Sequence, residues 1–363
     1  MTNPLTRATA VVRPSTGLIP SVVGGRGSDP LTRWLQIGGL VLVVALLVAA
    51  PYLGLSRYYI GLGSTVFCAA LLAASVNFLI GQVGLVPLGH AGIAAVAAYG
   101  VAISDRAGLD LGAQLGIALL ATLVVSLVYG VVSMRTSGIY FIMVTLAIGM
   151  LIYGLAYSMS SITFSDTGIN VRRPEAISEY WVYYYFALAI FIVGTVILWV
   201  IAKSPFGASL RGIRDSESRM RSLGYNVEAY KVGAFVASGL VAGMAGVLTL
   251  WSTRLVSSET ASILNSVLPI IMVVLGGVGT ILGPLVGAIA VVYLSFVVPS
   301  FFERWETLLG AVFIVVIMFA RTGIVGSLAK LYNWIRRKRA ASRGTGSPDV
   351  SAVAPIDNHR TIA

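Results

Sequence analysis

Ten apolar runs, most of them about 20 residues long, constrain this chain more than any other feature of its sequence. A run of that length, wound as an α-helix, matches the roughly 30 Å hydrocarbon core of a bilayer. The composition agrees, because 57% of the residues are hydrophobic and only 11% are charged, which excludes a water-soluble domain. We therefore predict an all-α, polytopic helical membrane protein with about ten transmembrane helices. The predicted spans are residues 35–55, 58–80, 84–104, 111–134, 138–162, 181–202, 232–251, 266–278, 281–300 and 305–320.

Two glycine-rich junctions interrupt this pattern, at residues 81–92 and 276–287. Their sequences, GQVGLVPLG and GGVGTILG, resemble each other and fall on the same predicted side of the membrane. Each junction is either a tight turn between spans or a re-entrant, broken helix. Elsewhere, glycines four residues apart permit close helix packing, as in the pairs Gly112 and Gly116, Gly239 and Gly243, and Gly283 and Gly287.

The charges predict the orientation. With both termini in the cytoplasm, the inner segments hold 19 of the 25 Lys and Arg residues, as the positive-inside rule requires. The net charge of +11 thus orients helices in a lipid bilayer and does not indicate nucleic-acid binding. We expect a disordered cytoplasmic tail at residues 1–33, a transmembrane domain at 34–335 and a disordered, basic cytoplasmic tail at 336–363.

One long charged stretch, residues 203–231, separates the sixth and seventh spans, and we call it the central segment. Ser204 followed by Pro205 is typical of a helix N-terminus, and Gly224 is typical of a left-handed helix stop. A helix over residues 216–223 would be about 12 Å long, too short to cross a bilayer, so it should lie along the membrane surface. The alternative is an ordinary solvated basic loop.

The chemistry that is missing excludes several functions. The interiors of the predicted spans hold no Asp, Glu, Lys or Arg, which argues against a proton-driven pump, although sodium coupling through carbonyls and hydroxyls stays open. No phosphate-binding GxxxxGK[ST] loop occurs, so ATP would be held by another subunit. We find no enzyme-like set of catalytic residues, and a single cysteine with two histidines predicts neither a disulfide nor a metal site nor a bound cofactor.

Five short motifs occur in an order that resembles one known family. The chain resembles the permeases of bacterial branched-chain amino-acid ABC importers of the LivM type, from about residue 62 to residue 320. The motifs lie at residues 81–83, 88–91, 137–147, 211–246 and 272–284.

The resemblance implies a set of partners and sites. It implies an inner-membrane transport subunit, not an enzyme, that pairs with a second permease as a heterodimer, two ABC ATPase subunits and an extracytoplasmic binding protein. The central segment would be a coupling loop whose short helix docks on an ATPase, with Glu217 as its expected charge contact. The residues expected in this coupling role are Arg211, Arg214, Asp215, Glu217 and Gly224. The residues expected along the substrate pathway are Gln82, His90, Thr145 and Gly277.

The substrate stays open at this point. Branched-chain amino acids are the first expectation, and urea, short amides and small carboxylates are the alternatives within the family. Two departures from the family pattern, Pro87 in the first junction and the 163–166 loop, fall where the substrate path would run. A secondary transporter or facilitator without an ATPase and a non-transporting membrane scaffold are the rivals from other classes.

Overall fold

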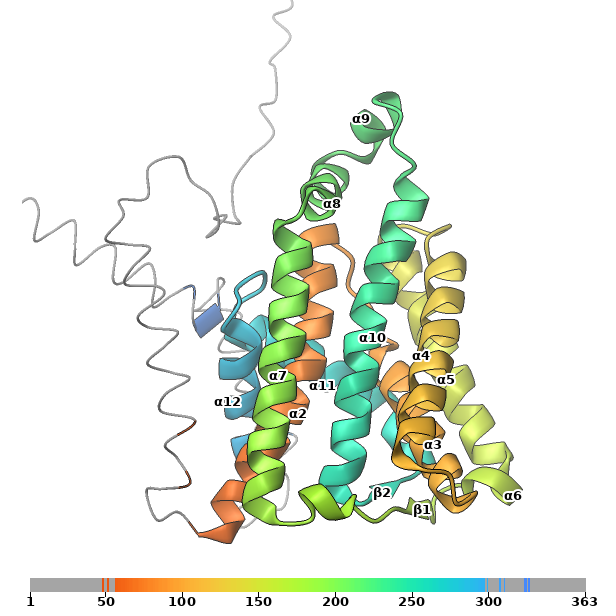
Figure 1. Cartoon of the computed structure of the whole chain (residues 1–363). Helices are drawn as coiled ribbons and strands as arrows, with labels where there is room; N and C mark the ends of the chain where they lie inside the picture. Colours follow the sequence, from red (N-terminus) through yellow and green to blue (C-terminus); the bar gives the residue numbers. More distant parts are fainter. Residues whose placement is uncertain are drawn as a thin grey trace, which may run out of the picture.

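The computed structural model describes residues 56–297 and, beyond them, single residues at positions 48, 51, 299, 307, 310, 323, 324 and 326. The predicted first span (35–55), tenth span (305–320) and both tails lie outside the described residues, apart from isolated positions. The described chain forms a helical bundle (Figure 1). Its elements, in order, are α2 (Arg57–Phe78), the π-helix η2 (Leu79–Val83), α3 (His90–Arg106), α4 (Leu111–Ser133), α5 (Ile139–Ser158), α6 (Ser160–Thr163), β1 (Ile169–Asn170), η3 (Glu175–Ile177), α7 (Tyr180–Lys203), α8 (Pro205–Asp215), α9 (Glu217–Ser222), α10 (Val227–Thr253), β2 (Leu255–Val256), η4 (Ser258–Ala261), α11 (Ile263–Gly276) and α12 (Gly283–Val297).

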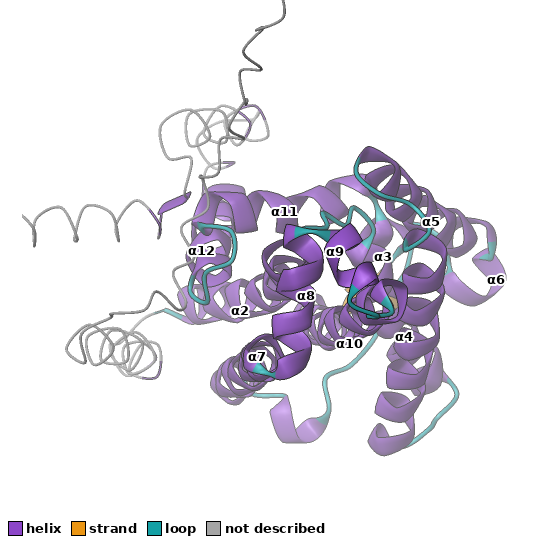
Figure 2. Cartoon of the chain, turned by 90° about the horizontal axis from the view of Figure 1, so that it is seen from above, coloured by secondary structure: helices purple, strands orange, loops and turns teal. Residues whose placement is uncertain are grey.

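Five of the described helices are long and apolar enough to cross a membrane: α2 with η2, α4, α5, α7 and α10. By contrast, α3, α11 and α12 have 17, 14 and 15 residues, or about 25, 21 and 22 Å, less than the roughly 30 Å bilayer core. Figure 2, which looks along the bundle, shows α11 lying across its edge while α7 and α10 are seen end-on. The polytopic helical membrane fold is thus confirmed, and the count of ten crossings stays a prediction.

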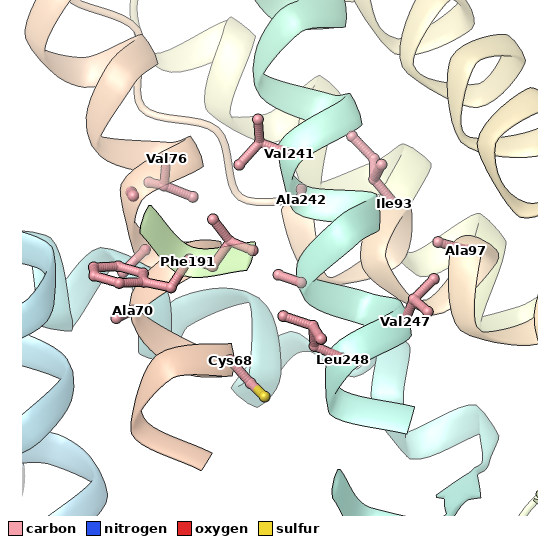
Figure 3. Close-up of a cluster of buried hydrophobic side chains, with 14 of the residues drawn as sticks. Cys68, Ala70, Val76, Ile93, Ala97, Phe191, Val241, Ala242, Val247 and Leu248 are labelled. Atoms are coloured by element: carbon pink, nitrogen blue, oxygen red, sulfur yellow. The ribbon is translucent and has the colours of Figure 1, made fainter. Parts of the chain in front are cut away.

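Helices α2 and α10 form the centre of the bundle. The apolar stretches of α2 with η2 and of α10 are 72% and 61% buried, whereas those of α4, α5 and α7 are only 22–28% buried. The three outer helices therefore turn most of their apolar side chains outward, as lipid contact requires. Figure 3 shows the central packing, where Val76 of α2 and Phe191 of α7 lie near Val241 and Leu248 of α10.

Small residues let α10 lie close to its neighbours. A Cβ atom on Gly246 would lie 2.6 Å from the backbone carbon of Ala94 in α3. One on Gly243 would lie 2.7 Å from Thr122 Oγ1 in α4. The predicted packing roles of the Gly239/Gly243 and Gly283/Gly287 pairs are confirmed, whereas a Cβ on Gly116 would meet no atom of the described residues within 4 Å, so close packing at the Gly112/Gly116 pair stays a prediction.

The third predicted span begins later than expected. Residues 84–89 are not helical, and α3 begins at His90 instead of residue 84. Gly84 ends η2 in a left-handed conformation with φ of 78°, and Pro87 has no N–H to donate to a helix. The seventh span begins earlier than predicted, because α10 starts at Val227, five residues before the predicted start. The side chain of Asn226 caps this helix by accepting a hydrogen bond from Ala229 N.

A short β-ribbon closes one end of the bundle and qualifies the all-α prediction. Strands β1 and β2 pair antiparallel, with Ile169 opposite Val256 and Asn170 opposite Leu255. Ser258 N donates to Ser165 O at 3.2 Å, which joins the two loops further. Figure 1 shows this β-ribbon end opposite the end that carries α8 and α9. The loops around Ser165 and Ser257 thus share one end of the bundle.

Candidate functional site

The central segment forms two helices, α8 and α9, between the helix start at Ser204 and the helix stop at Gly224 that the sequence predicts. Ser204 caps α8 by accepting a hydrogen bond from Gly207 N at 3.4 Å, and Pro205 occupies the first helical position, as predicted. Ser216 then adopts an extended conformation and caps α9 in the same way through Arg219 N. Gly224 has φ of 85°, so its predicted left-handed conformation is confirmed.

Apolar and aromatic contacts hold this segment to the bundle. Ile213 of α8, Met220 of α9 and Val227 of α10 form one buried cluster, with Tyr230 packed against it. The ring of Phe206 stacks on Tyr230 with 5.3 Å between centroids. The segment is therefore a packed part of the structure, and the reading of a freely solvated basic loop is wrong for these residues.

Arg211 and Arg214 form hydrogen bonds with η2, at the end of α2. Arg211 Nη1 donates to Gln82 Oε1 at 2.8 Å and to Ala202 O at 2.6 Å. Arg214 Nη1 donates to the carbonyl oxygen of Gly81 in η2. The two arginines thus share the face of α8 that is turned toward the bundle. Asp215 lies 3.5 Å from Arg214 Nε on the exposed side.

Glu217 pairs with Lys231, which lies one residue before the predicted seventh span. Lys231 Nζ bonds Glu217 Oε1, and the lysine side chain is only 7% exposed, against 38% for the glutamate. Arg221 Nη2 lies 4.0 Å from the same carboxylate. Since α10 begins at Val227, Lys231 is a buried charge inside a long helix, and its carboxylate partner offsets the desolvation of the ammonium group. Reversing the charge at Glu217 would thus disturb this pair as well as any docked partner.

The two glycine-rich junctions contact each other beside the bond between Arg214 and Gly81. The side chain of Asn77 in α2 donates to Thr280 O at 2.9 Å and accepts from Gly279 N at 2.7 Å. A Cβ atom on Gly81 would come within 3.0 Å of Gly279 Cα. The prediction that both junctions lie on the same side is confirmed. Of the four predicted pathway residues, Gln82 and Gly277 belong to this end of the bundle.

His90 and Thr145 lie together deeper in the bundle, around the start of α3. Thr145 Oγ1 accepts from Leu88 N at 3.1 Å, and Tyr129 Oη donates to Gly89 O at 3.1 Å. His90 is fully buried, and its Nε2 lies 2.8 Å from Ser238 Oγ.

Ser238 fixes the tautomer of His90. Ser238 Oγ donates its only proton to Ser75 O at 2.7 Å, so His90 Nε2–H must be the donor toward Ser238. Among the described residues, His90 Nδ1 has no hydrogen-bond partner. Ser238 lies eleven residues after Val227, the first residue of α10, or about 16 Å along that helix. Because His90 contacts Ser238, the start of α3 lies at this depth in the bundle.

A recess of about 320 Å³ lies at the β-ribbon end, away from all four predicted pathway residues. Its lining includes two arginines, Arg57 at the start of α2 and Arg173 before α7. Partial burial lowers the pKa of the Arg173 guanidinium, although an arginine stays charged. The sequence carries no signal that Arg57 and Arg173 share a recess, because they are 116 positions apart. In the described part of the chain, no group of three or more His, Cys, Asp or Glu side chains could hold a metal ion.

Comparisons with known proteins agree with the membrane architecture. Residues 58–320 match the family described as "Branched-chain amino acid transport system / permease component". The high-affinity branched-chain amino acid transport system permease protein LivM of Escherichia coli (strain K12) is 25% identical over 315 residues, covering 79% of this chain and 74% of LivM. The LivM protein of Salmonella typhimurium is 24% identical over the same shares.

A shorter match concerns a differently named permease. The autoinducer 2 import system permease protein LsrC of Photorhabdus laumondii is 32% identical over 96 residues, or 25% of this chain and 28% of LsrC. No solved structure matches the chain significantly. Since the family match spans well over half of the sequence, the chain belongs to the family of permease components of branched-chain amino acid transport systems.

Proposed function

We propose that this chain is the membrane-spanning subunit of an ATP-driven ABC importer that moves branched-chain amino acids across the bacterial inner membrane. A second permease would complete the translocation path, two ATPase subunits would bind the central segments, and an extracytoplasmic binding protein would deliver the substrate at the β-ribbon end. Both termini would lie in the cytoplasm. The observation that carries the proposal is the packed α8–α9 segment, which projects from one end of the bundle (Figure 1).

The contacts of this segment would let an ATPase act on three helices at once. Helix α8 follows α7 after Ser204 alone, so no flexible linker separates them. Helix α9 connects to α10 through four residues and shares the Ile213, Met220 and Val227 cluster. Arg211 and Arg214 bond the end of α2 through η2. A push on α9 would therefore displace α2, α7 and α10 together.

The π-helix η2 is a suitable joint for this movement. Its i→i+5 pattern is rarer and looser than α-helix, and such turns are frequent at functional sites. It receives the two arginines on one side and leads directly into residues 84–89 and the start of α3. Movement of the central segment would thus reach His90 and Thr145 through a short, irregular stretch of chain.

The names of the relatives support the substrate. Both LivM proteins, matched over most of their length, are named for branched-chain amino acids. LsrC is named for autoinducer 2, but its match covers only a quarter of this chain. Urea, short amides and small carboxylates are the alternative substrates, and a facilitator that needs no ATPase is the alternative mechanism.

Uptake by cells that lack this chain would test the proposal. We expect the uptake of labelled leucine, isoleucine and valine to fall, and to return when the chain is supplied again. In proteoliposomes that hold the whole transporter, uptake should stop when ATP is replaced by a non-hydrolysable analogue. Unchanged leucine uptake alongside a collapse of urea or amide uptake would refute the substrate, and uptake without ATP hydrolysis would refute the mechanism.

A further inference from the structure

The recess at the β-ribbon end has the size and place of a small-molecule site. Its volume of about 320 Å³ lies at the lower limit of the roughly 300 to 1,000 Å³ found for ligand pockets. The ends of α2, α7, α10 and α12 surround it, and α2, α7 and α10 are the helices that the central segment contacts at the other end. A solute bound here would therefore touch the helices that the ATPase is proposed to move.

Two guanidinium groups make the recess positive. Arg57 Cζ lies 5.3 Å from the ring centroid of Tyr180, and Arg173 Cζ lies 4.0 Å from that of Tyr183. Among residues 56–297, no carboxylate lies within ion-pair distance of either arginine, and no acidic residue lines the recess. Both charges are thus held in place by aromatic rings without being neutralised by a described residue.

The geometry of Arg173 leaves a donor for a ligand. Its Nε donates to Trp251 O and its Nη2 donates to Ser252 O at 3.2 Å, so two of its nitrogens are occupied at the end of α10. Among the described residues, Arg173 Nη1 donates no hydrogen bond. The first turn of α2 adds to the positive field, because Ser56 makes no side-chain cap and, among the described residues, the N–H groups of Arg57 and Tyr58 have no acceptor.

The other walls define the rest of the ligand. Leu62 and Phe296 give the recess an apolar side, which suits a short aliphatic group. The hydroxyls of Ser64 and Thr65, two residues that line the recess, donate to Ile60 O and Gly61 O at 3.1 and 3.2 Å, and Thr65 Oγ1 also lies 3.4 Å from Ser252 Oγ. Each oxygen has two lone pairs and can therefore accept a further hydrogen bond. Such oxygens accept hydrogen bonds, for example from an ammonium group.

We propose that this recess binds the carboxylate of a small aliphatic amino acid between Arg57 and Arg173, with the aliphatic side chain toward Leu62 and Phe296. This inference rests on the proposed import function and narrows its substrate. Urea and neutral amides carry no charge for the two guanidinium groups, so the permease itself would favour carboxylate-bearing solutes. Selectivity would then not belong to the binding protein alone.

Ligand-observed NMR on the full-length chain in lipid nanodiscs tests this without an ATPase or binding protein. The probes are leucine, 4-methylpentanoate, which keeps the carboxylate but lacks the amine, and leucinamide, which lacks the carboxylate. Leucine and 4-methylpentanoate should give saturation transfer, and leucinamide should not. Arg57→Gln should weaken the binding of both probes about tenfold, because it removes a charged hydrogen-bond donor to the carboxylate, and Arg57→Lys should restore most of the loss.

Arg172→Gln is the matched control, because Arg172 precedes Arg173, is exposed and does not line the recess. It removes the same charge and should leave binding unchanged. Equal binding to wild-type and Arg57→Gln chains, or of leucinamide, would overturn the proposal. So would competition by inorganic phosphate or loss of binding in nanodiscs of anionic lipid, either of which would assign the recess to a phosphate group. Normal ATP-driven uptake with no binding would refute this site alone, and binding without uptake would refute the import function alone.

Discussion

The ion pair between Glu217 and Lys231 allows the role of the central segment to be tested quantitatively. Breaking a buried ion pair costs about 3 to 5 kcal/mol, whereas an exposed pair contributes about 0 to 1 kcal/mol. The lysine side chain is 7% exposed and the glutamate 38%, so we place the cost of Glu217→Gln between these limits, at about 2 kcal/mol. That cost corresponds to about a 30-fold shift toward a state in which α9 has left the bundle.

Trypsin cleavage after Arg219 and Arg221 measures this opening directly, in the full-length chain in detergent. We expect Glu217→Gln to be cleaved faster and to bind less ATPase on co-purification. Glu228→Gln is the matched control, because Glu228 is an exposed acid of the same segment whose oxygen lies 3.5 Å from Arg221. It should behave as the wild type.

The charge swap Glu217→Lys with Lys231→Glu separates an internal role from a docking role. If Glu217 acts only by holding Lys231, the swap should restore both ATPase binding and slow cleavage after Arg219 and Arg221, which fragment masses distinguish from cleavage at the introduced lysine. If the carboxylate also contacts the ATPase, the swap should restore slow cleavage while ATPase binding stays low. Cleavage of Glu217→Gln at the wild-type rate would refute the reasoning, because it would mean that the pair contributes nothing to the position of α9.

Three further predictions concern packing, backbone and orientation. Gly246→Ala should lower the unfolding temperature in detergent, since overpacking costs about 1 to 3 kcal/mol. Gly154→Ala in α5 is the control and should not lower it, because a new Cβ there meets no atom of the described residues within 4 Å. Gly224→Val should cost roughly 1 to 2 kcal/mol for its left-handed backbone and reduce ATP-driven uptake at equal protein levels, while Gly224→Asn should retain more activity; equal uptake by the two would contradict this. In a cysteine-free chain in intact cells, an impermeant thiol reagent should label Ser165→Cys but not Ser216→Cys, and the reverse pattern would invert the predicted orientation.

Features that depend on neighbouring residues could be predicted from the sequence. The Ser204 cap, the proline after it and the left-handed Gly224 follow from local backbone chemistry, and all three are present. The long spans were found because about 20 apolar residues suffice to cross a bilayer. Their ends were less accurate where a polar residue is paired through space. The predicted seventh span excludes Lys231, although this lysine lies inside α10. Its burial depends on Glu217, which lies 14 positions earlier.

The parts of the candidate site that depend on distant residues could not be predicted. Nothing near Arg57 in the sequence indicates that it shares a recess with Arg173, since helix packing alone brings them together. Likewise nothing near Gln82 in the sequence indicates that its side chain accepts a hydrogen bond from Arg211 of the central segment, while its place on a substrate pathway stays a prediction. Hydrophobic patterning sets which segments enter the membrane, whereas tertiary packing decides which polar groups meet there.

The unwound stretch before α3 also has a consequence for how the chain is made. Leu88 N finds its acceptor in Thr145, 57 positions later, whereas Gly89 O has a local donor in Gly92 N in addition to Tyr129. A ribosome adds about 5 to 20 residues per second, so Leu88 N waits some seconds before its partner has been synthesised. An unpaired backbone group is costly in hydrocarbon, so the stretch must remain in water or in the insertion machinery until α4 and α5 arrive. Insertion of this part of the protein is therefore a collective event of three helices.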